Sequence, residues 1–214
     1  MTLLFGFSFI SFVAQAKMQF RSVCLMESAN LQKKIIDFEK QLFLLNELST
    51  ALDLQMKLAL AQLAITPGNL TVLGKITEIR IRQFRLDRIQ RGIITAGKTA
   101  IITELISTKA KILTNTRELS SFWAIYLGSV YSVDAFRTEL AVQPRTSGIA
   151  PNYELKPDYK AMQTVAYNWQ FNYFTKPEGQ KIVNSQNAFS LSCAIQPDRK
   201  DDLWTLEIQK DRYF

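Results

Sequence analysis

The stretch that decides the fold is residues 17–65, KMQFRSVCLMESANLQKKIIDFEKQLFLLNELSTALDLQMKLALAQLAI, which contains neither proline nor glycine. Its apolar residues recur at alternating steps of four and three, the heptad pattern of a helix that packs against another helix. We therefore expect one helix of about 70 Å, at 1.5 Å per residue. The predicted packing seam is Leu31, Ile35, Phe38, Leu42, Leu45, Leu52, Met56 and Leu63.

A turn follows this helix at residues 66–69, where Pro67 cannot continue a helix and Gly68 supplies the positive φ of a tight turn. A second helical segment extends from about residue 70 to about residue 115. Two such segments joined by a short turn predict an antiparallel helical hairpin. The seam would serve the hairpin itself or, alternatively, a neighbouring subunit. We assign residues 17–142 to this hairpin and to the aromatic segment 121–131 that follows it.

The C-terminal part changes from a helical to a strand-like period. Residues 143–163 have the composition of a linker or long loop, and residues 164–214 contain three runs in which apolar and polar residues alternate. We expect three antiparallel strands with one buried face, the turn between the last two falling at residues 197–200. Four rings share one face of the first strand: Tyr167, Trp169, Phe171 and Tyr173. The predicted fold class is α+β: an N-terminal apolar helix continuing into a long helical hairpin with a coiled-coil seam, then a small three-stranded antiparallel sheet.

The chain carries 26 Lys and Arg against 19 Asp and Glu, and residues 75–117 account for the whole excess of +7. Five arginines in this segment recur at helical spacings and form a predicted basic face: Arg80, Arg82, Arg85, Arg88 and Arg91. Such a face is most often simply solvated, and the alternatives are an anionic lipid or an acidic partner helix. Nucleic acid ranks below these partners, because Phe84 is the only aromatic residue interleaved with the arginines.

The chain has no histidine, which excludes Ser-His-Asp and Cys-His catalysis and His-ligated zinc. Two cysteines, Cys24 and Cys193, are too few for a disulfide-built scaffold or a four-ligand zinc site, although one disulfide is allowed. We therefore predict a protein that is not an enzyme and has neither cofactor nor metal. The cysteine count does not indicate whether the protein works in an oxidising or a reducing compartment.

One motif favours the opposite conclusion. Residues 92–99 satisfy the phosphate-loop pattern G-x-x-x-x-G-K-[ST]. A true phosphate loop follows a buried strand, whereas this one follows arginines at helical spacing, so a chance match within a helix is the favoured interpretation. A nucleotide-binding enzyme remains as an alternative, and its site residues would be Gly92, Gly97, Lys98 and Thr99.

The N-terminal residues 2–16 are uncharged and largely apolar. Three hypotheses compete: a membrane anchor, a secretory signal cut after Ala16, and a buried helix of a soluble protein. The anchor residues would be Leu3, Leu4, Phe5, Phe7, Phe9, Ile10, Phe12 and Val13. For a signal peptide, processing would occur at Ala14 and Ala16.

Two features of the N-terminal region resemble a known family. Leu3-Leu4-Phe5-Gly6-Phe7 is similar to the end of the membrane helix in TadE-like pseudopilins, and the amphipathic continuation from Lys17 through Leu31 resembles type IV pilin-like envelope proteins. The resemblance implies a structural component of a bacterial envelope assembly, anchored in the inner membrane with a periplasmic or extracellular body. It also implies processing at Gly6 and Phe7. Its partners would be membrane lipid, other envelope proteins or further copies of itself. The first alternative is a periplasmic or secreted helical binding protein cleaved after Ala16.

Overall fold

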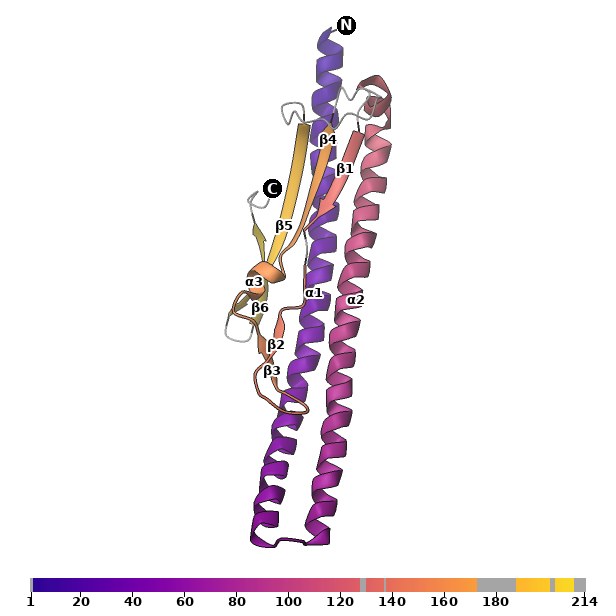
Figure 1. The fold of residues 1–214 in the computed structure, drawn as a ribbon. Helices are drawn as coiled ribbons and strands as arrows, with labels where there is room; N and C mark the ends of the chain where they lie inside the picture. The colour runs from indigo at the N-terminus through magenta and orange to yellow at the C-terminus, as the bar shows by residue number, and fades with distance from the viewer. Residues whose placement is uncertain (1, 128–129, 137, 173–187, 201–202, 210–214) are drawn as a thin grey trace. The chain divides into compact units, whose positions relative to one another are not determined.

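The computed structural model describes residues 2–127, 130–136, 138–172, 188–200 and 203–209. It confirms the α+β class (Figure 1). Helix α1 comprises Thr2–Ile65 and helix α2 comprises Leu70–Leu127. The turn between them is at the predicted position, with Gly68 at a φ of 83°. The predicted helical hairpin is therefore present.

The rest of the chain folds into short strands and one short helix. Four strands form one sheet: β1 (Val130–Ala135), β4 (Val165–Asn172), β5 (Ala188–Lys200) and β6 (Leu203–Gln209). A second, two-stranded sheet pairs β2 (Val142–Pro144) with β3 (Tyr153–Leu155), and α3 (Tyr159–Met162) follows it. The predicted linker 143–163 thus contains regular structure.

The chain divides into two compact units, each built from segments that are distant in sequence. Unit 1 contains residues 1–33, 101–138 and 163–214, and unit 2 contains residues 34–100 and 139–162. These limits cut across the predicted segments 17–142, 143–163 and 164–214, because each unit combines part of both long helices with part of the later chain.

The sheet of unit 1 has the strand order β1-β4-β5-β6, and every neighbouring pair is antiparallel. The prediction of three strands was wrong, because β1 lies in a segment that we had assigned to the hairpin region. The turn predicted at residues 197–200 was also wrong, since β5 continues to Lys200 and Pro197 pairs with Leu206. The pairing of β5 with β4 ends at Ile195, so Pro197 has a strand on one side only, where proline is tolerated.

The core of unit 1 lies where the sheet faces α1. Tyr167 and Trp169 of β4 are completely buried, and Val133 lies opposite Trp169 on the same face. Tyr173 and the side chains of the predicted aromatic segment 121–131 lie outside the described residues. On α1, a row of small and aromatic side chains at steps of four is buried: Phe12, Ala16, Phe20 and Cys24.

The predicted inner-membrane anchor was wrong. Among the residues that the structure describes, none of the helices has a stretch that is long and apolar enough to cross a membrane. Residues 2–16 would extend about 22 Å as a helix, short of the ~30 Å hydrocarbon core. Of the residues assigned to the anchor, Phe12 is buried, Phe9 and Val13 are half-buried, and Leu4, Phe7 and Ile10 are exposed; the side chains of Leu3 and Phe5 lie outside the described part.

Unit 2 is organised around the packing of α1 against α2. Leu52, Leu86 and Ala150 form one buried cluster, and Ala59, Val72 and Ile76 form another nearer the turn. The predicted seam follows the same face of α1: Leu31, Ile35, Leu42 and Leu52 are buried, and Phe38, Leu45, Met56 and Leu63 are half-buried. Leu31 alone of these belongs to unit 1.

The facing side of α2 contains polar residues that we did not expect in a packing face. Gln83 and Gln90 are buried at positions that continue the heptad spacing from Leu86. At Gly97 the backbone comes so close to its neighbour that an added Cβ would lie 3.3 Å from Cγ of Phe38. Small and polar residues therefore complete the contact.

Candidate interaction surfaces

A second row of apolar residues runs along α1 in unit 2, on a different face from the buried seam. It steps by 4, 3, 7 and 7 through Leu44, Leu48, Ala51, Leu58 and Ile65, with Gln55 and Gln62 at the two skipped heptad positions. At about 100° per residue, this face lies roughly 120° around the helix from the seam. We call these five apolar residues the outer stripe.

The outer stripe is exposed throughout. Leu44 is 75% exposed, Leu48 50%, Leu58 58% and Ile65 81%. Scattered exposed leucines are normal, but a row with regular heptad spacing is typical of a helix that packs on two sides. The sequence carries both rows, and we recognised only the one that the hairpin uses.

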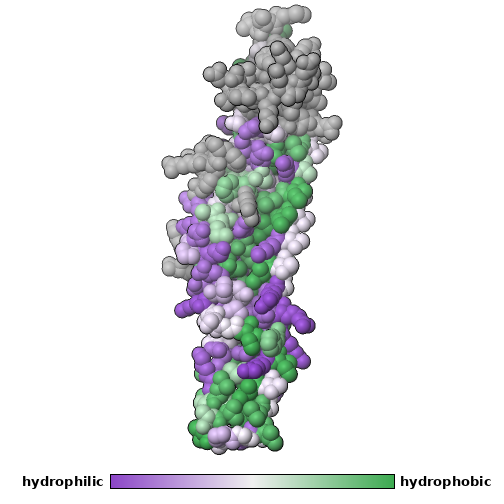
Figure 2. Space-filling view, viewed as in Figure 1, coloured by the Kyte–Doolittle hydropathy of each residue, from purple (hydrophilic) through white to green (hydrophobic). Residues whose placement is uncertain are grey.

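The end of the hairpin in unit 2 is also apolar. Residues 58–74 contain no charged side chain, and Leu60, Leu70 and Leu73 are exposed beside Leu58 and Ile65. Figure 2 shows these hydrophobic residues in green at the lower end of the view, where α1 turns into α2. We call residues 58–74 the hairpin tip.

The predicted basic face lies on the exposed side of α2. All five arginines, Arg80, Arg82, Arg85, Arg88 and Arg91, are exposed. Arg82 pairs with Glu78 at 2.5 Å and Arg91 with Asp87 at 2.9 Å, both one helical turn away. Within the part of the chain that the structure describes, the other three have no acidic partner at ion-pair distance.

Apolar side chains are interleaved with these arginines. Ile81, Phe84 and Ile89 are each about half exposed. A groove beside the tip is lined by polar and apolar residues of both helices, among them Gln55, Leu58, Lys75 and Arg82. The exposed surface of α2 that follows the hairpin tip is therefore both basic and apolar.

The predicted phosphate loop lies inside α2, at residues 92–99. Backbone amides there donate to helical carbonyls, so they cannot surround a phosphate. Gly97 contacts Phe38, and Lys98 and Thr99 are exposed, with the Thr99 hydroxyl donating to the Thr95 carbonyl at 3.0 Å. Gly92 has open space around it. The four residues of the motif form no binding loop.

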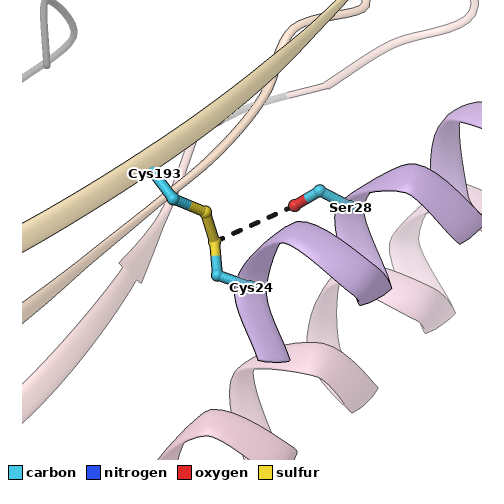
Figure 3. Close-up of a disulfide and its surroundings, with 3 residues drawn as sticks. All are labelled: Cys24, Ser28 and Cys193. Atoms are coloured by element: carbon cyan, nitrogen blue, oxygen red, sulfur yellow. Dashed lines mark hydrogen bonds between the residues drawn. A yellow bond between two sulfur atoms is a disulfide. The ribbon is translucent and has the colours of Figure 1, made fainter. Parts of the chain in front are cut away.

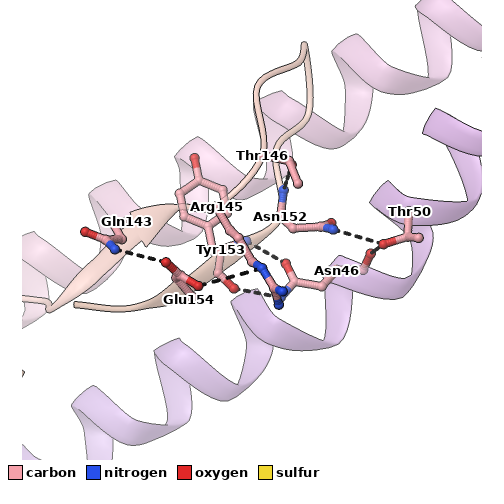
Figure 4. A network of polar contacts seen from close by, with 8 residues as sticks. All are labelled: Asn46, Thr50, Gln143, Arg145, Thr146, Asn152, Tyr153 and Glu154. Atoms are coloured by element: carbon pink, nitrogen blue, oxygen red, sulfur yellow. Dashed lines mark hydrogen bonds and ion pairs between the residues drawn. The ribbon is translucent and has the colours of Figure 1, made fainter. Parts of the chain in front are cut away.

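A polar network holds the segment after β2 against α1 in unit 2 (Figure 4). Asn46 Nδ2 donates to the Tyr153 carbonyl, and the Tyr153 N–H donates to Asn46 Oδ1, each at 2.8 Å. Ser49 Oγ donates to the Ala150 carbonyl at 2.5 Å, and Gln90 Nε2 of α2 donates to the Pro151 carbonyl at 2.9 Å. Side chains of the two helices thus form hydrogen bonds with the backbone of residues 150–153, in the segment that leads into β3. These hydrogen bonds could not be predicted from the sequence, because single Asn, Ser and Gln residues also occur on solvated faces.

A disulfide joins α1 to the sheet in unit 1. Cys24 and Cys193 are bonded with their Cα atoms 6.5 Å apart, and Ser28 Oγ lies 3.9 Å from the Cys24 sulfur (Figure 3). The sequence left this disulfide open. Cys193 lies directly opposite Tyr167 in the sheet, on the face that packs on the helix.

A buried polar group lies near this face in unit 1. Glu27 is buried and accepts a hydrogen bond from Lys111 Nζ at 2.8 Å, which raises the pKa of Lys111. Burial raises the pKa of the Tyr167 phenol to about 12. The charges that face Tyr167 are Glu27 and Glu104, and both disfavour its anion.

Two further predicted features lie in α1. Gly6, Phe7, Ala14 and Ala16 are all helical, and Ala16 is buried in the core of unit 1. Among the described residues, no three His, Cys, Asp or Glu side chains are grouped so that they could hold a metal ion.

Comparison with protein families, with curated proteins and with solved structures finds no match to this chain. The resemblance to TadE-like pseudopilins therefore stays a prediction.

Proposed function

We propose that this chain is a structural protein without catalytic activity, which assembles with further copies of itself through the outer stripe of α1. The observation that carries the proposal is the heptad spacing of exposed apolar residues on that face. A seam of this kind is complementary to the same seam on another helix, because each apolar side chain fits between those of its partner.

The free energy gained by burying the outer stripe is large enough to offset the entropic cost of association. Burying a Leu or Ile side chain from water contributes roughly 1.5–3 kcal/mol, and each copy offers three leucines and one isoleucine. The loss of translational and rotational freedom costs roughly 4–15 kcal/mol. Two copies that bury their stripes together would therefore associate with moderate affinity, and several copies side by side would associate more strongly.

The disulfide supports a structural role in a particular environment. Disulfides persist where thiols are kept oxidised and are rare where they are kept reduced. Cys24 and Cys193 are 169 residues apart in sequence, so their bond closes most of the chain into one loop. We infer that the protein works in an oxidising compartment.

Light scattering and sedimentation velocity over a range of concentrations test this function. We expect the native chain to associate, and the double substitution Leu44→Gln and Leu48→Gln to weaken association by roughly 100-fold, since 1.4 kcal/mol corresponds to tenfold. The matched control is Ile89→Gln, which changes an exposed apolar residue of unit 2 on α2. A chain that stays monomeric throughout, or a double variant that associates like the native chain, would contradict the proposal.

A further inference from the structure

The hairpin tip combines three properties that are seldom found together at an exposed turn. It has no charge over residues 58–74, both helices contribute to it, and five of its large apolar side chains are exposed: Leu58, Leu60, Ile65, Leu70 and Leu73. Ile65 and Leu70, on the two sides of the turn, are each 81% exposed. An exposed apolar cluster of this kind is typical of a surface that contacts a partner or a membrane.

Several polar groups at the two helix ends of the tip have hydrogen-bond partners within the chain. The last turn of α1 is closed by Thr66, whose N–H and hydroxyl both donate to the Gln62 carbonyl, at 3.0 and 2.9 Å. The first turn of α2 is closed by Asn69, whose Oδ1 accepts from the N–H groups of Thr71 and Val72, at 3.0 and 3.4 Å. Because these groups have partners within the chain, moving them into a less polar medium costs less.

Basic residues begin where the uncharged stretch ends. Lys57 and Lys75 flank it, and residues 75–91 contain six basic and two acidic side chains. Among them, Arg80, Arg85 and Arg88 are exposed. Positive charge therefore lies next to the hairpin tip along both helices, and most of it is on α2.

The depth of the uncharged region matches a shallow insertion. At 1.5 Å per residue, residues 58–65 extend about 10 Å along α1 and residues 70–74 about 6 Å along α2. Apolar faces of peripheral helices are buried ~5–10 Å into the boundary between headgroups and acyl chains. With the tip at that depth, the first basic residues of α2, Lys75 and Arg80, would lie at the level of the headgroups.

We propose that the hairpin tip binds the surface of a lipid bilayer that carries anionic headgroups, with its exposed apolar side chains among the upper acyl chains and the first basic residues of α2, Lys75 and Arg80, on the headgroups. Charge complementarity favours an anionic surface, since the flanking charge is predominantly positive. A bilayer also accommodates a projecting apolar turn without a pocket of matching shape, which a protein partner would have to supply. The contact is peripheral and requires no membrane-spanning helix.

The test uses the full-length, disulfide-bonded chain and sedimentation with vesicles. We expect binding to vesicles of phosphatidylcholine with about one third phosphatidylserine, little binding to phosphatidylcholine alone, and weaker binding as salt increases. The double substitution Leu70→Asp and Leu73→Asp should reduce binding at least tenfold. It places acidic residues in the first turn of α2, where the helix dipole favours them, so the fold should be kept.

Two controls separate the tip from the other surfaces. The outer-stripe variant Leu44→Gln and Leu48→Gln should bind vesicles like the native chain even if it no longer assembles. A tryptophan placed by Leu70→Trp should show a blue-shifted emission with anionic vesicles, relative to the parent chain, whereas Leu44→Trp should not. Circular dichroism confirms that each variant is folded.

Several results would overturn the proposal. These are equal binding to neutral and anionic vesicles, no binding to anionic vesicles at low salt, and unchanged binding by the Leu70→Asp and Leu73→Asp variant. The last result would mean that the basic face alone attracts the lipid. If the same variant changed only the association state of the protein, the tip would be a protein contact instead.

Discussion

The two units fasten the later chain to the long helices by different chemistry. In unit 1, the sheet presents completely buried rings, Tyr167 and Trp169, and a disulfide joins it to α1 at Cys24. In unit 2, the segment after β2 is held by side-chain amides and a hydroxyl that bond to its backbone, with Ala150 as its main apolar contact. One attachment is apolar and covalent, and the other is polar and distributed.

This difference shows which parts of a structure a sequence can predict. Alternating rings require a strand with a buried face, and the position of a strand residue fixes which neighbours share that face. A polar attachment has no period, because each amide serves one carbonyl at one place. Strand β4 of unit 1 and its buried face could therefore be predicted from the sequence. The polar attachment of unit 2 could be identified only from the three-dimensional structure.

The largest effect should follow removal of the disulfide. Replacing both cysteines, Cys24→Ser and Cys193→Ser, should lower the free energy of unfolding by about 3–5 kcal/mol, because the bond restricts a long loop in the unfolded chain. Urea denaturation of the variant against the native chain measures this. Hydrogen exchange should show the loss of protection in β4 and β5 of unit 1, with little change in residues 139–162 of unit 2.

An equal loss of protection in both units would contradict the difference between their attachments, since it would mean that the two units unfold together. The native chain under reducing conditions provides the matched control. It should behave like the double variant, because reduction removes the same bond and leaves every other side chain unchanged.

A smaller effect is expected at alkaline pH and should be concentrated in unit 1. The pKa of Tyr167 is raised to about 12 from an ordinary 10.0, so its neutral form stabilises the fold fully below pH 10, and this contribution is lost as the pH rises through 12. At about 1.4 kcal/mol per pH unit, the rise of the pKa from 10.0 to about 12 gives a full loss of about 3 kcal/mol, of which roughly 2 kcal/mol is reached by pH 12. Lys111, whose pKa is also raised, adds to the loss above pH 10.5.

The variant Tyr167→Phe isolates the tyrosine. Its unfolding free energy should fall less steeply between pH 10 and 12 than that of the native chain, as measured by urea titrations at several pH values. Tyr153→Phe in unit 2 is the control: burial also raises the pKa of Tyr153, but this side chain is only half-buried, so the change in slope should be smaller. Equal slopes for Tyr167→Phe and the native chain would show that the phenol is not effectively desolvated.

Some elements of the fold could be predicted from local sequence patterns, and others could not. The heptad seam, the turn at Pro67 and Gly68 and the alternation around Trp169 were each sufficient to place an element, because proline, glycine and period act locally. Strand β1 and the continuation of β5 through Pro197 were not, since both depend on a partner strand. The exposed Leu44 and Leu48 belong to a second row with heptad spacing, which was missed because the buried seam already explained the heptad pattern.

The smallest effect should come from the polar attachment of unit 2. Asn46→Ala removes both hydrogen bonds to the Tyr153 backbone and leaves a half-buried N–H and carbonyl unpaired, which should cost about 1–2 kcal/mol. Thr50→Ala is the control: it removes an exposed contact with Asn152, and the change should stay within about 0.5 kcal/mol. Because the attachment is distributed, Ser49 and Gln90 should keep the segment in place, so hydrogen exchange in residues 139–162 should increase only near Tyr153. Release of the whole segment by this one substitution would show that a single amide, and not the set, holds it.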